Sequence, residues 1–452
     1  MSSIRWVVIA GAVVVGLAAL AIAVGALWLN SFIHSPAFKT EVETRASQTL
    51  GGTVEIQSID FDILHGIKLQ GLAAQIDPSH AGGQGALQVQ VASANCGFSW
   101  GDLLQRKLRL TGVTLDQPQV ILTRQETAPM APANPAPATA STPSGPVTGE
   151  SSGSSMPFQF VLDSAKISNG SVSVRDANGT SMVELKGVNA EANTSGYYEG
   201  KDMTGTLRVG NAAASNMEVT DFSTPFTYNN GVLQAQPFSA SAFSGNIAGG
   251  YRMALPGPSV LDLNGKGLNV AQLTAATASS SSAKLSGSLD LQSKWRGVET
   301  SNLDGEGDAL LSNGKLEGVK ILEEVGQVLK IKELEDPIIT SAKTHFVVKD
   351  LQTKFIGLQL VSPLFQITGD GTVYRDGNLN ANLVLILTRD AMGRLPKEVA
   401  ASFVQQQDGT GSIAFQVTGT TSNPQTDLAT RLLMQNTQIK NVINKALNKF
   451  FK

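Results

Sequence analysis

The sequence is poor in the residues that build thiol and metal chemistry. Cys96 is the single cysteine among 452 residues, so the chain can form neither an internal disulfide nor a cysteine-based zinc site. The four histidines are scattered, without the spacing of helical metal ligands; they are His34, His65, His80 and His345. We therefore predict no metal site and no cofactor.

Charge of either sign is also scarce. Lys and Arg total 34 against 37 for Asp and Glu, and charged residues make up 16% of the chain, below the roughly 25% that is common in globular proteins. The net charge of −3 argues against a nucleic-acid-binding protein, which usually carries a basic excess. Glycine is abundant, at 45 residues. This composition favours β-structure with many tight turns.

Catalytic motifs are absent or lie in the wrong context. The sequence has no P-loop, no glycine-rich dinucleotide motif before a helix and no Asp-rich calcium loop. Residues 97–101 match G-x-S-x-G, but the helix that a nucleophile elbow requires does not follow them. A second match at 149–153 lies in a Ser- and Gly-rich stretch, where chance explains it. We therefore predict that the protein is not an enzyme.

A long apolar run follows a short tail of residues 1–5. Residues 6–29 contain no charged side chain, and a helix of that length spans about 36 Å, enough for the ~30 Å hydrocarbon core of a bilayer. The alternative is a cleaved signal peptide, because residues 21–23 resemble a cleavage site. The apolar region of a signal peptide is shorter than this run, however, and the run continues past that site. We predict a transmembrane anchor, whose orientation the flanking charges do not settle.

From residue 53 the hydrophobic pattern has a period of two. Leu289-Asp-Leu291 and Ile413-Ala-Phe415 alternate apolar with polar or small residues, which is typical of half-buried strands. Asn-Gly and Asp-Gly pairs predict hairpin turns; they begin at Asn169, Asn178, Asn230, Asn264, Asp304, Asn313, Asp370, Asp376 and Asp408. We predict a mainly β protein, in which the N-terminal transmembrane helix precedes an elongated antiparallel β-sheet groove with a few helices.

Helical signals appear in four segments. Residues 35–50 begin with Ser35 as the N-cap and Pro36 in the first turn, and end before two glycines. Residues 318–334 and 390–404 carry apolar side chains at helical spacing, although Gly393 and Pro396 interrupt the second segment. Residues 428–451 combine an apolar stripe with a basic face, which indicates an amphipathic helix.

One segment separates two β modules. Residues 126–157 are dominated by Pro, Ala, Ser, Thr and Gly without periodicity, so we predict a disordered linker. The predicted organisation is then an N-terminal module at 30–125, a C-terminal module at 158–425 and the amphipathic basic helix at 426–452.

Several motifs in these modules resemble a known family. They are LGGTVEI at 50–56, LHGIKLQGL at 64–72, FSWGDLLQRKL at 98–108, LDQPQVILTR at 115–124, GEGDALLSNGKLEGV at 305–319, GDGTV at 369–373 and VTGTTSNP at 417–424. Together with their position behind one apolar span, these motifs resemble AsmA-like envelope proteins. The resemblance covers most of residues 30–430 apart from the linker, which departs from the family pattern.

The resemblance implies a location and a function. AsmA-like proteins are anchored in the bacterial inner membrane, face the periplasm, and are implicated in outer-membrane assembly and phospholipid transfer along a β-groove. Alternating strands fit this function, because acyl chains on an apolar face gain about 0.8 kcal/mol per buried CH₂. The expected partners are phospholipid, the inner membrane and an envelope or outer-membrane protein. A scaffold or assembly factor that carries no lipid is the alternative.

Two sets of candidate site residues follow. Leu289, Leu291, Ile413 and Phe415 are predicted to line the apolar groove. Residues of the C-terminal helix are candidates for contact with a membrane or a partner; they are Lys440, Lys445, Lys449, Phe450 and Phe451. The alternative for this helix is a lid, whose apolar stripe packs on the open end of the sheet.

Overall fold

The computed structural model describes residues 36–62, 66–76, 85–99, 102, 107–124, 159–194, 202–255, 257–276, 284–297 and 303–434. The predicted anchor at 6–29, the predicted linker at 126–157 and residues 435–452 lie outside these described residues. Within the described ranges, no helix combines the length and the apolar character needed to cross a membrane.

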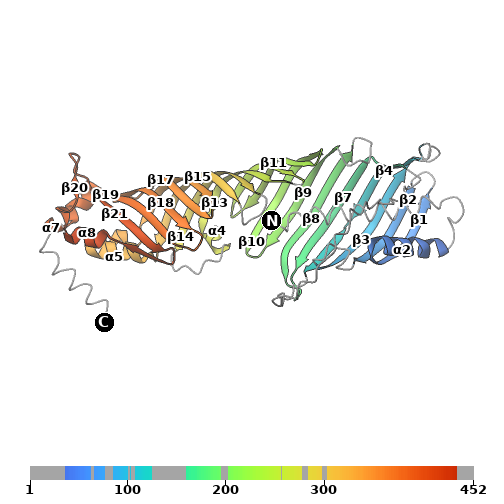
Figure 1. The fold of residues 1–452 in the computed structure, drawn as a ribbon, viewed down its shortest axis with the longest axis horizontal. Coiled ribbons are helices and arrows are strands. Elements are labelled where there is room, and N and C mark those ends of the chain that lie inside the picture. Colours follow the sequence, from blue (N-terminus) through green and yellow to red (C-terminus); the bar gives the residue numbers. More distant parts are fainter. Residues whose placement is uncertain are drawn as a thin grey trace, which may run out of the picture. The chain divides into compact units, whose positions relative to one another are not determined.

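The described chain is mainly β-structure with few helices (Figure 1), as the period of two predicts. The strands are β1 (Gly52–Asp62), β2 (Gly66–Ile76), β3 (Gly85–Phe98), β4 (Lys107–Asp116), β5 (Gln119–Arg124), β6 (Gln159–Leu162), β7 (Ser164–Arg175), β8 (Ser181–Thr194), β9 (Asp202–Ala214), β10 (Met217–Asn229), β11 (Val232–Ala242), β12 (Gly245–Ala254), β13 (Ser259–Asn269), β14 (Lys284–Gly297), β15 (Asp304–Glu317), β16 (Ile338–Lys349), β17 (Gln352–Val361), β18 (Phe365–Tyr374), β19 (Leu379–Leu387), β20 (Val404–Gln405), β21 (Gly411–Thr420) and β22 (Asn423–Thr426). The helices are α2 (Pro36–Leu50), α4 (Val270–Ala276), α5 (Lys320–Leu329), the 3₁₀ helix η2 (Lys332–Leu334), α6 (Arg389–Arg394), α7 (Lys397–Ala400) and α8 (Leu428–Met434).

Strand pairing is mostly antiparallel, with a parallel exception that the sequence analysis did not predict. β4 pairs in parallel with β6 and β7, and β5 pairs in parallel with β7. Parallel strands need a crossover connection of a dozen or more residues, and residues 125–158 between β5 and β6 are long enough to supply it. Because of this pairing, residues 159–175 belong to the sheet of the preceding strands.

The Asn-Gly and Asp-Gly pairs are only partly turns. Those beginning at Asn178, Asn230, Asp376 and Asp408 lie in turns, but Asn264, Asp304, Asn313 and Asp370 lie inside strands, and so does Asn169. Asn169 and Asn313 have φ of 52° and 50° at irregular points of the β7–β8 and β14–β15 ladders. At these two positions the tolerance of Asn for positive φ permits a bulge in the strand instead of a turn.

The helix predictions are confirmed in outline and corrected in detail. α2 begins at Pro36 and is followed by Gly51 with φ of 64°, as expected of a helix that a glycine terminates. The segment predicted at 318–334 is divided, because Lys330 takes a left-handed conformation between α5 and η2. The segment at 390–404 is divided into α6 and α7 at Pro396, which cannot continue a helix.

The described residues fall into two compact units. The N-terminal unit holds those up to Ser215 together with Tyr228–Asn230, and the C-terminal unit holds Asn216–Thr227 and those from Gly231 onward. The division therefore falls after β9, whereas the sequence analysis placed the module boundary at 126–157. The reason is the pairing of β6 and β7 with β4 and β5, which keeps them in one unit.

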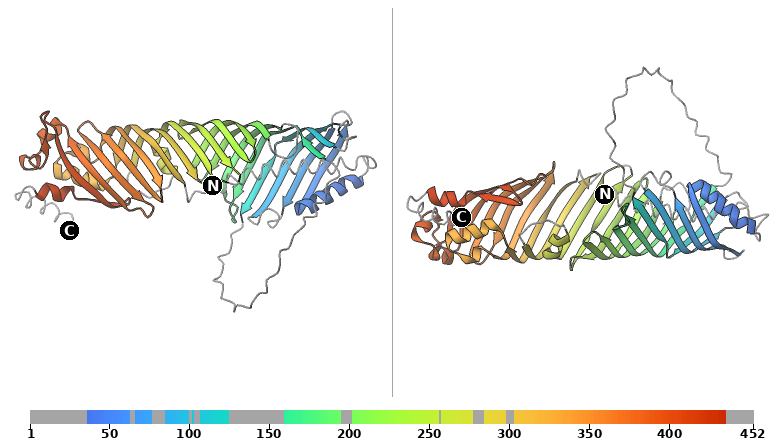
Figure 2. Two further views of the ribbon diagram at one scale, coloured as in Figure 1. Left: turned by 45° about the horizontal axis from the view of Figure 1, so that its top comes forward. Right: turned by 90° about the horizontal axis from the view of Figure 1, so that it is seen from below.

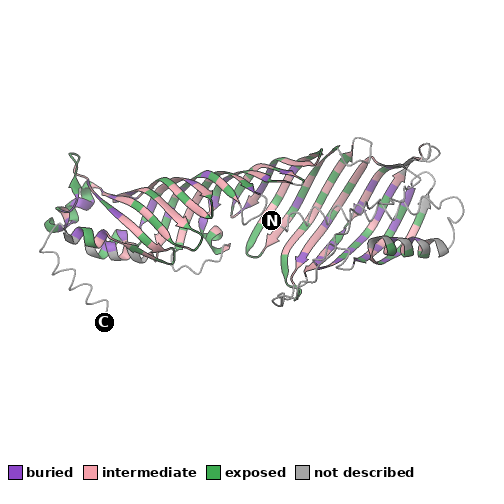
Figure 3. Cartoon of the chain, in the orientation of Figure 1, coloured by how far each residue is buried: buried purple, intermediate pink, exposed green. Residues whose placement is uncertain are grey.

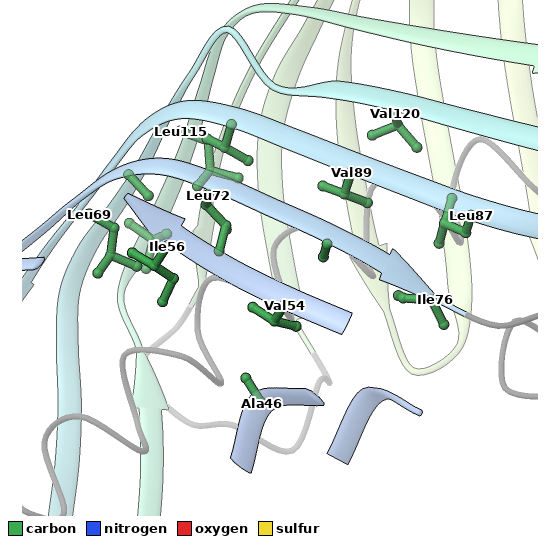
Figure 4. Packing of buried hydrophobic residues seen from close by; sticks show 14 of the residues in the cluster. Ala46, Val54, Ile56, Leu69, Leu72, Ile76, Leu87, Val89, Leu115 and Val120 are labelled. Carbon is green, nitrogen blue, oxygen red and sulfur yellow. The ribbon is translucent and has the colours of Figure 1, made fainter. Parts of the chain in front are cut away.

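The N-terminal unit has a well-buried core (Figure 4). Inward side chains of β1 to β5 and β7 meet there, and Val42 and Ala46 of α2 join them. Figure 4 shows Ala46 below Val54 and Ile56 of β1. Alternation along these strands places the apolar residues on one face, which is the burial pattern that the sequence predicts.

Side chains of α2 also bond the backbone of β1. The Ile56 amide donates to Glu43 Oε1 at 2.7 Å, and the Val54 amide donates to Ser47 Oγ at 2.9 Å. Amides at the edge of a sheet that lack an acceptor invite pairing with another chain. The helix thus satisfies two backbone donors as well as covering part of the core.

Connections in the C-terminal unit differ between its two rims. α4, α5 with η2, and α6 with α7 connect the strand pairs β13–β14, β15–β16 and β19–β21, and we call their side the helix rim. The opposite ends of the strands carry short turns, for example at 255–258, 350–351 and 375–378, and we call that side the hairpin rim. Figure 2 shows α5 and α8 close to β19 and β21 in both views.

Helices cover the last strands of the C-terminal unit. Leu329 of α5, Ala391 of α6, Val399 of α7 and Leu428 of α8 pack in one buried cluster with side chains of β18, β19 and β21. Asp427 connects α8 to β21 through two hydrogen bonds. Its carboxylate accepts from the backbone N–H of Gln416 in β21 at 2.7 Å and from Arg431 Nε in α8 at 2.6 Å. Burial acts to raise the pKa of Asp427, but these bonds outweigh it and lower the pKa.

Candidate functional site

The candidate site is one face of the C-terminal sheet. Along β14, Leu289, Leu291 and Trp295 are half-buried, whereas Asp290 and Lys294 between them are exposed. Successive residues of a strand point to opposite faces of the sheet, and partners in neighbouring strands point to the same face. The register of the strands therefore shows which residues share the face of Leu289, and we call it the apolar face.

Three cross-strand rows define the apolar face. The helix-side row runs through Leu268, Leu289, Leu311, Ala342, Leu360, Ile367, Leu385 and Ile413. The middle row runs through Phe238, Gly249, Leu263, Ser293, Gly307, Phe346, Phe355, Gly371, Ala381 and Val417. The hairpin-side row runs through Ala235, Tyr251, Leu261, Trp295, Gly305, Val348, Thr353, Val373 and Leu379.

No member of the three rows is charged. Charges are found on the opposite face of the same strands, where Lys294 pairs with Asp262 and His345 contacts Asp308. These side chains are exposed, so the pairs add little stability. They do make the two faces differ in polarity. The charged face is suited to contact with water, and the apolar face is suited to contact with apolar groups.

Burial changes systematically across the apolar face. Every member of the hairpin-side row is half-buried, whereas the helix-side row includes fully buried residues such as Leu311 and Leu385. Val270, at the start of α4, packs beside Leu311 and Ile339 and contributes to that coverage. Figure 3 shows the same contrast, with buried positions near α5 and α8 and mostly half-buried or exposed positions along β14 to β18.

The four predicted groove residues share this face but not one environment. Leu289 and Ile413 belong to the helix-side row. Leu291 and Phe415 lie two residues further along the same strands, on the same face and nearer the hairpin rim. Leu289 and Leu291 are half-buried. Ile413 and Phe415 are only 8% and 7% exposed, inside the cluster that the helices cover. Only the β14 pair is therefore placed where a ligand can reach it.

Aromatic rings lie on glycines at the open part of the face. Trp295 is the partner of Gly305, and a Cβ at Gly305 would come within 2.3 Å of the indole ring. The Trp295 ring is 6.1 Å from that of Phe346, and its Nε1 donates to Ser293 Oγ at 2.9 Å. Glycine thus lets a large ring lie close to the sheet, which keeps the space above the strands open.

Sequence reasoning did not select Trp295 or Phe346 as site residues. Trp295 lies two alternations after Leu291 on the same strand, so the period of two was a sufficient signal for its face. The pairing of β15 with β16 that brings Phe346 beside it is not visible in the sequence. The candidate contacts Lys440, Lys445, Lys449, Phe450 and Phe451 lie outside the described residues.

Metal ligands and a reactive thiol were sought in the part of the chain that the structure describes. No cluster of three His, Cys, Asp or Glu side chains suited to a metal ion is found among those residues. Cys96 is buried in the N-terminal core, and burial raises the pKa of its thiol to about 12. A thiol with that pKa is almost entirely protonated at neutral pH, and therefore a poor nucleophile.

Comparisons with protein-family models, with curated proteins and with solved structures gave no match to this chain.

Proposed function

We propose that the protein is a membrane-anchored periplasmic protein of the AsmA-like class, which binds phospholipid on the apolar face and transfers it during envelope and outer-membrane biogenesis. The observation that carries the proposal is an apolar face without charged residues, whose hairpin-side row stays half-buried from β11 to β19. Large exposed apolar patches mark binding sites in soluble domains. An acyl chain laid on this face would gain about 0.8 kcal/mol per buried CH₂.

Acyl chains fit the face better than a folded protein partner does. Protein interfaces commonly add polar and charged groups around an apolar centre, and charges are absent from all three rows of the face. The rows supply only aliphatic, aromatic, glycine and hydroxyl-bearing residues. Hydrophobic contacts with such a surface do not depend on the orientation of the bound group. They therefore suit flexible alkyl chains.

The decisive experiment compares two neighbouring positions of β14. Leu291→Glu places a charge on the apolar face, where it meets acyl chains without a partner, and Gln292→Glu places the same charge on the exposed opposite face. The full chain of each variant is purified from membranes and its lipids are quantified by mass spectrometry. Lipids around the anchor are common to both variants and cancel in the comparison.

We expect the Leu291→Glu protein to carry less phospholipid per chain than the Gln292→Glu protein. Equal lipid content in two folded variants would contradict lipid binding on this face and would favour the scaffold without lipid. The proposed anchor is tested separately, because alkaline extraction should leave the full chain in the membrane fraction. Its release into the soluble fraction would refute the anchor.

A further inference from the structure

The rows of the apolar face differ in chemistry as well as in burial. The helix-side row consists of Leu, Ile and Ala alone. The hairpin-side row contains Tyr251, Trp295 and Thr353, each of which joins an apolar body to a polar group. Tyr and Trp side chains favour boundaries at which one end is apolar and the other is wet. Polarity therefore rises from the helix rim toward the hairpin rim.

The hydroxyl of Tyr251 points toward the hairpin rim, since its Oη contacts Met253 Sδ at 3.4 Å. Trp295 Nε1 donates to Ser293 Oγ at 2.9 Å, so the indole is held flat without presenting an unpaired donor to the apolar face. At the helix rim, by contrast, Val270 and Ile339 are buried, and the helix-side row contains no Tyr or Trp.

We propose that a phospholipid lies on this face with its polar head at the hairpin rim and its acyl chains directed toward the helix rim, and that Trp295 marks the boundary between head and chains. This inference rests on the proposed function, from which it takes the ligand. Helices close the apolar face at the helix rim, so the chain ends are sheltered there. Half-buried residues along the hairpin rim leave the head in water, where its charge requires no protein partner.

The test uses tryptophan quenching by brominated lipid in the full chain. Trp6, Trp28 and Trp100 are replaced by Phe, which leaves Trp295 as the single tryptophan. The protein is reconstituted in phosphatidylcholine vesicles whose acyl chains carry bromine either near the ester end or near the methyl end. Unbrominated vesicles give the reference fluorescence. We expect the greater loss of Trp295 fluorescence with bromine near the ester end.

A second position on the same strand supplies the matched comparison. Leu289→Trp combined with Trp295→Phe moves the single tryptophan six residues toward the helix rim, about 20 Å along the strand. We expect the reverse order at this position, with the greater loss from bromine near the methyl end. Native Trp295 needs no substitution in the face itself, so its result stands even if the Leu289→Trp protein fails to fold.

Each outcome separates the orientation from the proposed function. Greater quenching of Trp295 by bromine near the methyl end would overturn the orientation while leaving lipid binding intact, and so would equal quenching by both lipids. Fluorescence equal to that in unbrominated vesicles, with either lipid, would show that no lipid lies on the face. That result would overturn the proposed function and this inference together.

Discussion

Leucine-to-alanine substitutions at three positions measure how far the apolar face is covered. Leu385 is 2% exposed, Leu291 is half-buried on the open part of the face, and Leu310 is 41% exposed on the opposite face. All three lie in strands of the C-terminal unit, and the chemistry of the change is identical. Differences between them therefore report the surroundings of each side chain.

Expected losses of unfolding free energy follow from burial. At Leu385 the substitution removes a side chain packed between Ile367 and Ile413 and leaves a cavity, which costs about 3–5 kcal/mol. Full burial of a leucine contributes roughly 1.5–3 kcal/mol by transfer alone. A half-buried Leu291 should then lose about 1 kcal/mol, since solvent or lipid fills the space. Leu310 should change stability by less than about 0.5 kcal/mol.

The assay is urea unfolding of the full chain, in which Trp6, Trp28 and Trp100 are replaced by Phe. The fluorescence of Trp295, the single remaining tryptophan, monitors the transition. Trp295 lies in the same unit as the three leucines, so its signal reports the unfolding of that unit. Linear extrapolation gives the free energy of each variant, and unchanged slopes indicate unchanged native compactness. A loss at Leu291 equal to that at Leu385 would refute the reasoning, because the face would then be covered at β14 as it is at β19.

Three further predictions concern local contacts. Gly305→Ala should displace the Trp295 ring and shift its fluorescence to longer wavelength, whereas Gly393→Ala, with open space around it, should leave the emission unchanged. The lowered pKa of Asp427 means that its stabilising effect is present above the ordinary Asp pKa of about 3.9 and is lost as the pH falls through the lowered pKa. The protection of α8 amides from hydrogen exchange, relative to the intrinsic exchange rate at each pH, should therefore fall in acid, and Asp427→Asn should remove that dependence. Glu43→Ala should lower the unfolding free energy of the N-terminal unit by about 1–3 kcal/mol, because a β1 amide loses its acceptor; denaturation should show a smaller loss for Glu43→Gln, which keeps an acceptor oxygen.

Alternation predicted which residues share a face, because that property is local. Leu289 and Leu291 fall on one side of β14 whatever the strand pairs with, and Asp290 falls on the other. Asn-Gly pairs were a weaker guide. Asn264 lies within β13, where the strand continues through the pair, since a residue that tolerates positive φ does not require it.

Long-range packing accounts for what the sequence could not predict. The burial of Ile413 and Phe415 depends on α5 to α8, and nothing in the alternating pattern of β21 distinguishes it from that of β14. The parallel pairing of β4 with β6 depends on a crossover rather than on either strand. Lys330 divides a predicted helix by adopting φ of 56°, although lysine is an ordinary helix former.

The uncovered part of the apolar face is best explained by an occupant. Each half-buried leucine forfeits roughly 1 kcal/mol relative to full burial, and the chain covers equivalent residues elsewhere, since Leu385 and Ile413 lie under helices of the same unit. α4 already reaches the helix rim of β13 and β14, yet its buried residue is Val270 at its first position. The hairpin-side row stays half-buried along its whole length. A face that is charge-free, flattened by an aromatic ring lying over glycine, and sheltered by helices along one rim is what the proposed function requires of a surface for a ligand with one apolar end.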